Sequence, residues 1–346
     1  MLLSLIFLLL IASSHAALNG SDFEYALSRE AFEFAAASYA DNPWPCLKRS
    51  NSSLILQVEV PCDTVHDKCW AIVINAPKRI VVAFQGTASK TQLINELIET
   101  VVSAKHYLDK IGSVERYFYV ALKSIQEPIA QKINKLREAY PEKQLLFTGH
   151  SLGGALASLA ATLYASAFHI PPEQIRLVTF GQPRVGNHEY AMSVDRLIPK
   201  AWRIVHGADL VAHVPYCISL FKSCGDFFNH SPYHHGTEVW FPKSMGPNGL
   251  YRVCSGLPED EDSKCSNNQF LYNIDDHLRY FDVHVSDYGI GGCAAQPAMG
   301  TIKGYRKDAD VADKLRALKK AAYGRMIRDF TDYLEDIERN RTGSFY

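Results

Sequence analysis

Residues 149–153 place one serine between two glycines, in the order Gly-His-Ser-Leu-Gly. An apolar run precedes them and an Ala/Leu-rich segment follows, so we expect a strand, a sharp turn and a helix. Such a turn raises the hydroxyl of Ser151 above the sheet, and the glycines remove side chains that would collide with the strand or the helix. The first amides of the helix would face a developing oxyanion. This context favours a nucleophilic serine over the alternative, a buried serine in an ordinary Gly-rich turn.

A serine hydroxyl is inert without a base, and the base needs an orienting carboxylate. In a strand–turn–helix context the three groups occur in the order Ser, Asp, His. Asp209 follows an apolar run in RIVHGADLVAHVP, and His277 lies later in DDHLRYFDVHV. We therefore predict that Ser151 attacks an ester carbonyl while His277 takes its proton. Asp209 would hold the tautomer of the imidazole and stabilise the imidazolium.

The other histidines and acids have weaker contexts. His150 lies inside the turn, and we expect it to pack or hydrogen-bond beside the serine rather than to act as the base. Structural roles are expected for the histidines that flank Asp209, which are His206 and His213. Weaker rivals of His277 are His234, His235 and His284. We expect solvated loop charges at Asp195, Asp275 and Asp276.

An oxyanion needs hydrogen-bond donors from more than one segment. The amide of Leu152, at the start of the predicted helix, is the first candidate. The second comes from AFQGTAS, where Thr87 offers its amide and its hydroxyl directly after a β-branched run. Losing one such donor typically lowers turnover on the order of 10²–10³-fold. Alone, the Gly-Thr pair would indicate an ordinary turn.

The elements that must position these groups alternate along the chain. Helical spacing predicts helices over residues 21–41, 113–140 and 153–168. Apolar and β-branched runs predict strands over residues 54–60, 69–75, 79–84, 144–148, 175–180 and 201–206. Such alternation predicts right-handed crossovers and a mostly parallel central sheet flanked by helices, an α/β fold. From residue 216 to about residue 275 the periodicity fades, which predicts ordered loops stapled by disulfides.

Composition excludes some classes of protein. The chain has 346 residues, of which 47% are hydrophobic and 21% charged, an ordinary globular balance. Its net charge of −1 argues against a nucleic-acid-binding domain, which would be basic. No Cys-x-x-Cys spacing suggests zinc, so we predict no metal and no cofactor. Nothing in the sequence identifies a partner protein.

The N-terminus points to the secretory pathway. Residues 1–16 form an apolar run that ends in small residues, as a signal peptide does, and a retained N-terminal anchor is the alternative. We predict no transmembrane segment, since no later run reaches the length of a membrane span. Sequons for glycosylation occur at Asn19, Asn51, Asn229 and Asn340. We therefore expect a secreted protein, or one of the lysosomal lumen.

The cysteines fit that compartment. An even count of eight in a secretory chain implies disulfides, although many pairings are possible. Short spacings suggest the pairs Cys62 with Cys69, Cys217 with Cys224, and Cys254 with Cys265. A bridge between the remaining two, Cys46 and Cys293, would close a loop that spans nearly the whole domain.

Six blocks together resemble the secreted class 3 lipases, the filamentous-fungal type of triacylglycerol lipase. They are VVAFQGTAS, FTGHSLGGALASLAA, VTFGQPRVGN, RIVHGADLVAHVP, YHHGTEVWF and DHLRYF, and they fall in the expected order between residues 25 and 295. The resemblance implies an α/β-hydrolase fold, ester hydrolysis of a lipid at an oil–water or membrane interface, and the same triad and oxyanion donors. It also implies the bridges Cys46–Cys293 and Cys254–Cys265. Gln85 departs from the family's usual arginine, and Cys217 and Cys224 are additional.

The segment after the oxyanion loop is amphipathic. In TASKTQLINELIETVV, a capping-box pattern precedes apolar residues at helical spacing, among them Leu93, Ile94, Leu97 and Ile98. Periodicity alone favours an ordinary helix packed on the core. The family resemblance implies instead a helical lid over the active site, which would turn its apolar face toward a lipid surface.

These observations define three regions and one expected activity. We expect a signal peptide at 1–16, a lipase domain at 17–296 and a C-terminal helical extension at 297–346, packed on the domain. The expected activity is hydrolysis of acylglycerol esters by a secreted serine esterase. A phospholipase, a mono- or diacylglycerol esterase and a catalytically inactive lipid-binding relative remain the alternatives.

Overall fold

The computed structural model describes residues 23–61, 68–87, 105–217, 219–220, 223–224, 231–246, 249–255, 261–269, 272–294, 320 and 324. The predicted signal peptide and the predicted lid, with Leu93, Ile94, Leu97 and Ile98, lie outside these residues. So does the C-terminal extension, apart from residues 320 and 324. These three assignments therefore stay predictions.

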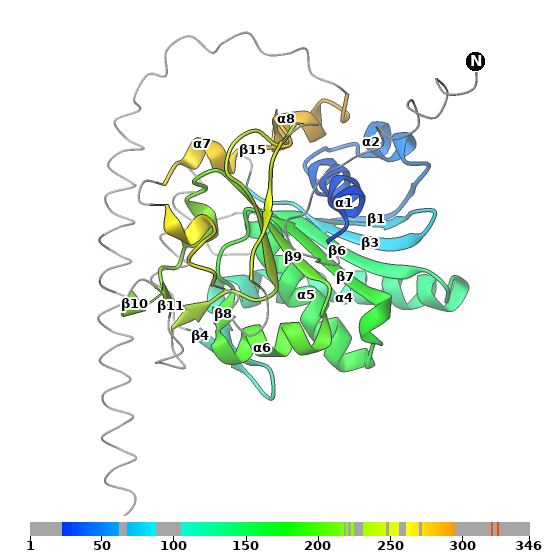
Figure 1. Cartoon of the computed structure of the whole chain (residues 1–346). Coiled ribbons are helices and arrows are strands. Elements are labelled where there is room, and N and C mark those ends of the chain that lie inside the picture. The colour runs from blue at the N-terminus through cyan, green and yellow to red at the C-terminus, as the bar shows by residue number, and fades with distance from the viewer. Residues whose placement is uncertain are drawn as a thin grey trace, which may run out of the picture.

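An eight-stranded sheet forms the centre of the domain (Figure 1), in the order β1-β2-β3-β6-β7-β9-β13-β14. The neighbours from β3 to β13 pair in parallel, whereas β1, β2 and β14 pair antiparallel at the two edges. The prediction of a mostly parallel sheet is confirmed. The strands are β1 (Ser53–Pro61), β2 (Lys68–Asn75), β3 (Arg79–Phe84), β6 (Gln144–His150), β7 (Ile175–Phe180), β9 (Ala201–His206), β13 (Thr237–Phe241) and β14 (Arg252–Val253).

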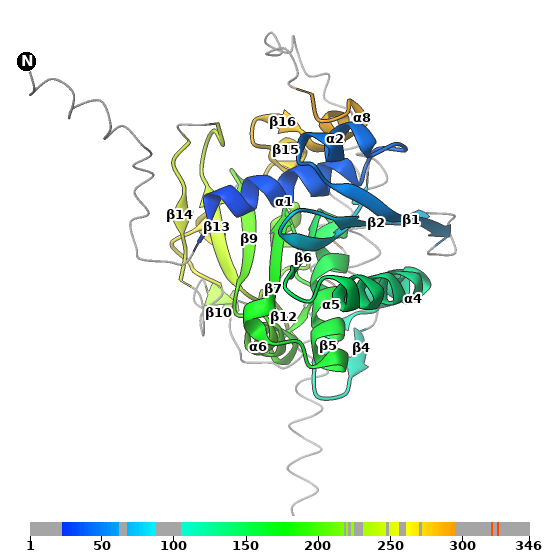
Figure 2. The same ribbon diagram turned by 90° about the vertical axis from the view of Figure 1, so that its right-hand side faces the viewer.

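Helices cover both faces of this sheet, as the two views agree (Figures 1 and 2). One face carries α1 (Tyr25–Ala37), with α2 (Trp44–Arg49) and α8 (Val285–Ile290) beside it. The other face carries α4 (Arg116–Ala139), α5 (Leu152–Phe168) and α6 (His188–Leu197). Successive strand residues point to opposite faces. In β3, for example, Val82 and Phe84 join the core under α4 and α5, while Val81 and Ala83 join the core under α1.

Several small elements differ from the sequence predictions. The helix expected from residue 113 begins at Arg116, because Gly112–Glu115 pairs as β5 with β4 (Lys105–Leu108). These two strands form a second sheet with β8 (Gly186–Asn187) and β12 (Pro232–Tyr233). The first helix, predicted over residues 21–41, spans Tyr25–Ala37. The remaining short elements are β10 (Ser219–Leu220), β11 (Ser223–Cys224), α7 (Ile274–His277), β15 (Arg279–Tyr280) and β16 (Val283–His284).

Helix α6 corrects one expectation about charge. Asp195 lies on this helix and is buried, so it is not a solvated loop charge. Its carboxylate accepts a hydrogen bond of 2.7 Å from the amide of Gly236. The helix begins at Asn187, whose side chain accepts from the amide of Tyr190 and so caps it.

Disulfides tie the outer elements to the domain. Cys46 in α2 is joined to Cys293 beyond α8, closing a separation of 247 residues. Cys254 is joined to Cys265. A disulfide typically contributes about 2–4 kcal/mol, and more when the loop that it closes is long, largely by constraining the unfolded chain. Cys69 and Cys217 are also disulfide-bonded, while Cys62 and the side chain of Cys224 lie outside the description, so those pairings stay predictions.

Of the four sequon asparagines, Asn51 is described and is exposed at the turn between α2 and β1. Asn19, Asn229 and Asn340 lie outside the described residues. None of the described helices combines the length and the apolar character needed to cross a bilayer.

Candidate active site

Ser151 occupies a strained turn between β6 and α5. Its backbone has φ 61° and ψ −129°, a combination that residues with a side chain rarely adopt. Three hydrogen bonds hold the turn: the Ser151 amide donates to the carbonyl of Phe180 at 2.9 Å, and the amides of Gly154 and Ala155 donate to the Ser151 carbonyl. The serine is therefore fixed at the carboxyl end of the parallel strands, where α5 begins.

The glycines of the motif are required by close packing. A Cβ on Gly149 would lie 2.3 Å from the carbonyl carbon and oxygen of Gly153. A Cβ on Gly153 would lie 2.2 Å from the backbone oxygen of Phe84 in β3. Any larger residue at either position would push α5 away from the sheet. This crowding is the physical reason for the two glycines around the serine.

Asp209 follows β9 and is completely buried. Its two carboxylate oxygens each lie 3.0 Å from Nδ1 of His277. Oδ1 also accepts from the amide of Val211 at 2.8 Å, and Oδ2 accepts from the hydroxyl of Tyr280 at 2.6 Å. Burial opposes ionisation, but His277 and Tyr280 outweigh it and lower the pKa of Asp209 to about 2. The carboxylate is therefore charged at neutral pH.

His277 ends α7 and is also completely buried. The short helix is fixed to the loop that carries Asp209. The amide of Ala208 donates to the carboxylate of Asp276 at 2.8 Å, and the amide of Asn273 donates to the carbonyl of Ala208 at 2.7 Å. Asp276 is thus a structural acceptor rather than the solvated charge that its sequence context suggested. Because of these bonds, the imidazole and its carboxylate are held on one rigid unit.

Gly181 lies against this pair. It follows β7 with φ +56°, and a Cβ there would lie 2.7 Å from Oδ2 of Asp209 and 2.7 Å from Nδ1 of His277. The sequence contains this glycine in VTFGQPRVGN but gives no sign of its contact, since the three residues are far apart along the chain. A hydrogen atom in place of a side chain is therefore what allows the aspartate and the histidine to meet.

We expect Gly181→Ala to lower kcat by about 100-fold or more, because displacing catalytic groups by about 1 Å can cost that much. The measurement is hydrolysis of a soluble p-nitrophenyl ester by folded protein. The matched control is Gly292→Ala, which alters another left-handed glycine (φ +76°) whose nearest neighbour is the side chain of Pro45. An alanine at 181 with unimpaired turnover would contradict the placement of Asp209 and His277.

The predicted nucleophile and the predicted base are not hydrogen-bonded to each other in this structure. Oγ of Ser151 and Nε2 of His277 are both buried, and neither has a hydrogen-bond partner within the described residues. These are the two atoms between which a proton would pass. Catalytic hydrogen bonds are often open in a structure without substrate and close in the reacting complex.

The predicted oxyanion loop lies directly against the serine. A Cβ on Gly86 would be 3.1 Å from Cβ of Ser151, 2.3 Å from the carbonyl oxygen of His150 and 2.4 Å from the hydroxyl of Tyr39. Thr87, the next residue, is buried as well. Gly154 and Ala155 donate to Ser151, whereas the preceding amide of Leu152 has no acceptor within its own helix. Of the two predicted donors, Leu152 thus follows the serine directly, and Thr87 follows the glycine that packs against it.

His150 joins three parts of the site. Its Nε2–H donates to the carbonyl of His277 at 2.8 Å, so its Nδ1 accepts from the hydroxyl of Tyr39, also at 2.8 Å. Its ring stacks on that of His277 with centroids 4.6 Å apart. Burial, and then the proximity of His277, lower the pKa of His150 to about 3. A neutral ring with both nitrogens engaged positions the base and cannot act as one.

The other histidines support the loops. His213 donates to the carbonyl of Asp209 at 2.7 Å, and His234 donates to the carbonyl of Ala212 at 2.7 Å. His235 bonds to Ser158, and His206 to the carbonyl of Asp276. Burial lowers the pKa values of His213 and His234, so both stay neutral. These contacts agree with the structural roles expected for His206 and His213, and they give His234 and His235, which were weaker rivals of His277, structural contacts as well.

A buried ion pair supports the segment after Asp209. Arg184 and Glu261 meet in two hydrogen bonds of 2.7 and 2.9 Å. Arg184 also donates to the carbonyls of His213 and Pro215. Burial raises the pKa of Glu261, but the charge of Arg184 outweighs it and keeps that pKa well below its usual range. Sequence analysis missed this pair because 77 positions separate the partners.

One cluster has the composition of a metal site, formed by Glu238, Cys254 and Cys265. The two cysteines are joined to each other in a disulfide. Metal ligation requires thiolates, so their sulfur atoms cannot serve. This cluster therefore does not fit a metal ion.

A family model and the sequences of known proteins both match this chain to lipases. The model for "Lipase (class 3)" matches residues 81–219. A lipase of Caenorhabditis elegans is 32% identical over 326 residues, which cover 87% of this chain and 91% of the relative. A lipase of Rhizopus niveus is 32% identical over 215 residues, 60% of this chain and 49% of that relative.

Solved structures agree with the fold. The crystal structure of a lipase from Rhizopus microsporus var. chinensis aligns with a TM-score of 0.63 and 27% identity, covering 76% of this chain and 90% of that one. The predicted α/β-hydrolase fold is thereby confirmed.

Proposed function

The chain belongs to the class 3 lipase family, and we propose that it hydrolyses acylglycerol esters with Ser151, His277 and Asp209 as its catalytic residues. As a lipase of this family it is a carboxylic ester hydrolase. The observation that carries the assignment of residues is the buried pair of Asp209 and His277 beside the strained turn of Ser151. In this pair, Nδ1 of the imidazole is hydrogen-bonded to Asp209, and Nε2 has no hydrogen-bond partner within the described residues.

The reaction follows from this geometry. His277 Nε2 accepts the proton of Ser151 Oγ as that oxygen attacks the ester carbonyl. The amides of Leu152 and Thr87 donate to the resulting oxyanion, and Asp209 stabilises the imidazolium. The imidazolium then gives its proton to the departing alcohol and leaves an acyl-serine. Water, deprotonated by the same imidazole, releases the fatty acid.

Access to the serine requires movement. Ser151 and His277 are each 0% exposed, so a triacylglycerol cannot reach them as they stand. We propose that the predicted lid, with Leu93, Ile94, Leu97 and Ile98, opens at a lipid surface. Its position in the sequence soon after Gly86, which packs against the serine, supports this role. Burial of its apolar face in lipid, at roughly 25 cal/mol per Å², would offset the cost of opening.

A substrate titration tests lipase function and the lid together. We expect fatty acid release from a short-chain triacylglycerol to rise sharply once its concentration exceeds its solubility. A soluble p-nitrophenyl ester should show ordinary saturation in the same preparation, since it needs no interface. If the rate instead follows a smooth hyperbola as the triacylglycerol concentration passes the solubility limit, lid opening is refuted. If no acylglycerol releases fatty acid, the proposed function is refuted. Parallel assays with diacyl-, monoacyl- and phospholipids would identify the preferred head group.

We also propose that the protein passes through the secretory pathway. The apolar run at residues 1–16 and the Cys46–Cys293 bridge support this route, because disulfides persist in oxidising compartments. Asn51 is exposed and therefore accessible to a glycan.

A further inference from the structure

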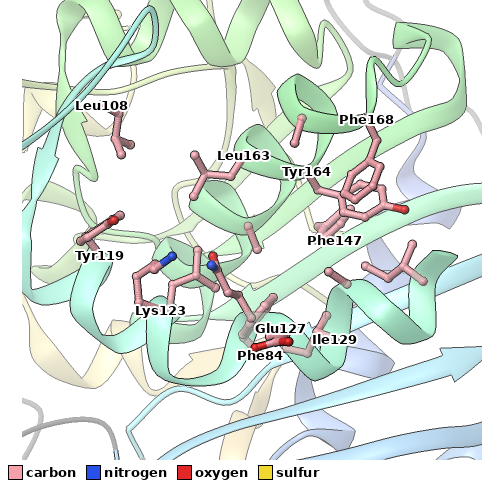
Figure 3. A pocket seen from close by; sticks show the side chains of 16 residues that line it. Phe84, Leu108, Tyr119, Lys123, Glu127, Ile129, Phe147, Leu163, Tyr164 and Phe168 are labelled. Carbon is pink, nitrogen blue, oxygen red and sulfur yellow. The ribbon is translucent and has the colours of Figure 1, made fainter.

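A cavity of about 530 Å³ lies between helices α4 and α5 (Figure 3). Phe84 of β3 and Phe147 of β6 contribute to its lining from the sheet. Apolar side chains of the two helices form most of the remaining wall, including Leu122, Ile129, Ile133, Leu163, Tyr164 and Phe168. The polar members of the lining are Lys123, Gln126 and Glu127, all of α4. Its size is that of a small-molecule site, which typically encloses about 300–1,000 Å³.

This cavity is not the entrance to the catalytic serine. Its lining includes none of Ser151, Asp209 and His277, and neither Gly86 nor Thr87. It lies on the helix face of the sheet that α4 and α5 cover, whereas α1 covers the other face. Phe168 at its edge is 44% exposed, so the apolar lining continues to the protein surface.

One cation faces this apolar space. The side chain of Lys123 lines the cavity and points into it in Figure 3. None of the ion pairs among the described residues includes Lys123. Glu127, one turn further along α4, accepts instead from Gln131 at 3.4 Å. Among the described residues that line the cavity, Lys123 is therefore the one cation, with Gln126 and Glu127 as its polar neighbours on α4 and apolar side chains beyond them.

The shape of the lining suits an extended chain. On α4 it runs from Tyr119 to Ile133, about 21 Å at 1.5 Å per residue. Lys123 lies near one end of this run, and the ring of Tyr119 is held there by stacking on His106. From Lys123, the lining continues along α4 for about 15 Å to Ile133, first past the polar Gln126 and Glu127 and then along apolar residues.

We propose that this cavity binds a long-chain fatty acid, with its carboxylate at Lys123 and its hydrocarbon chain between α4 and α5. The identity of the ligand rests on the proposed function, because an acylglycerol lipase releases such carboxylates at every turnover. The site holds the product apart from Ser151. Methylenes buried on Phe147, Ile129 and Leu163 supply affinity, and the ammonium fixes the direction of the chain.

Fluorescence titration of full-length Ser151→Ala protein with cis-parinarate tests this site without requiring catalysis. We expect saturable binding to one site. Lys123→Gln should weaken it about fivefold, the size of effect expected for a partly exposed ion pair. Lys135→Gln is the matched control, because Lys135 is on the same helix and does not line the cavity. It should bind as the parent does.

Two further measurements separate the cavity from the active site. Methyl parinarate, which lacks the charge, should bind Lys123→Gln and its parent equally. Ala160→Trp fills the cavity and should weaken binding at least tenfold, with circular dichroism to verify its folding. Wild-type protein carrying a covalent phosphonate on Ser151 should bind parinarate as well as unlabelled protein does.

Each contrary result overturns the proposal. Loss of parinarate binding after phosphonate labelling would place the fatty acid at Ser151. Equal affinity of Lys123→Gln and its parent for parinarate would remove the recognition of the carboxylate. If the full chain shows no saturable binding, the cavity does not bind a fatty acid, and another occupant, such as the predicted C-terminal helical extension at 297–346, would fill it. None of these outcomes depends on whether acylglycerols are hydrolysed, so the proposed function is judged separately.

Discussion

Ser151→Ala is expected to lower kcat for a p-nitrophenyl ester by about 10⁶-fold, the loss seen when a serine nucleophile is removed from a triad. In the proposed reaction, the oxygen of this hydroxyl forms the acyl intermediate, and alanine offers no substitute for it. Alanine removes one oxygen that has no hydrogen-bond partner within the described residues, so the fold should be unaffected. Thermal unfolding by circular dichroism should therefore match the wild type.

The matched control is Ser158→Ala, seven residues further along α5. The hydroxyl of Ser158 bonds to Tyr190 at 2.7 Å and to His235 at 2.8 Å, so its loss should cost stability of about 1–3 kcal/mol. It has no part in the proposed chemistry, and turnover should be retained. Substantial hydrolysis by purified Ser151→Ala would show that another residue is the nucleophile.

Asp209→Asn is expected to lower kcat by about 10⁴-fold with little change in KM. An amide can hold His277 in the wrong tautomer, as the equivalent change does in serine proteases. Steady-state kinetics on a soluble ester measures the effect. The matched control is Asp195→Asn, which alters another buried carboxylate, one that bonds to the amide of Gly236. That variant should lose stability and keep turnover.

Asp209→Asn should also change how the stability of the fold depends on pH. The folded-state pKa of Asp209, about 2, lies below the usual unfolded value near 3.9. Its ionisation therefore stabilises the fold above pH 4, and this contribution disappears as the pH falls toward 2. The difference in Tm between the wild type and Asp209→Asn should shrink over that range. A pH-independent difference, together with unimpaired turnover, would show that Asp209 is not the buried partner of His277.

Local patterns in the sequence account for the central elements. β7 and β9 match the predicted ranges because apolar runs bounded by polar residues specify buried strands directly. The turn at Ser151 could be predicted since its glycines, strand and helix are contiguous. In contrast, β8 and β12 are two residues long and pair with distant segments, so no periodicity reveals them.

The parts of the site that sequence analysis missed are contacts between distant segments. Tyr280 donates to Asp209 from 71 positions away, and Gly181 makes room for both Asp209 and His277. Both residues lie in blocks that the family resemblance contains, but their roles depend on spatial proximity. Asp195 resembled a surface charge for the same reason, because its acceptor role depends on Gly236.

Mapping a phosphonate adduct tests the catalytic assignment most directly. Wild-type protein would be inactivated with a p-nitrophenyl alkylphosphonate, digested and examined by peptide mass spectrometry. We predict one adduct, on Ser151, formed in step with the loss of activity and at least 10³-fold more slowly in Asp209→Asn. Complete inactivation with the adduct on a different residue, or full activity after stoichiometric labelling of Ser151, would contradict the account.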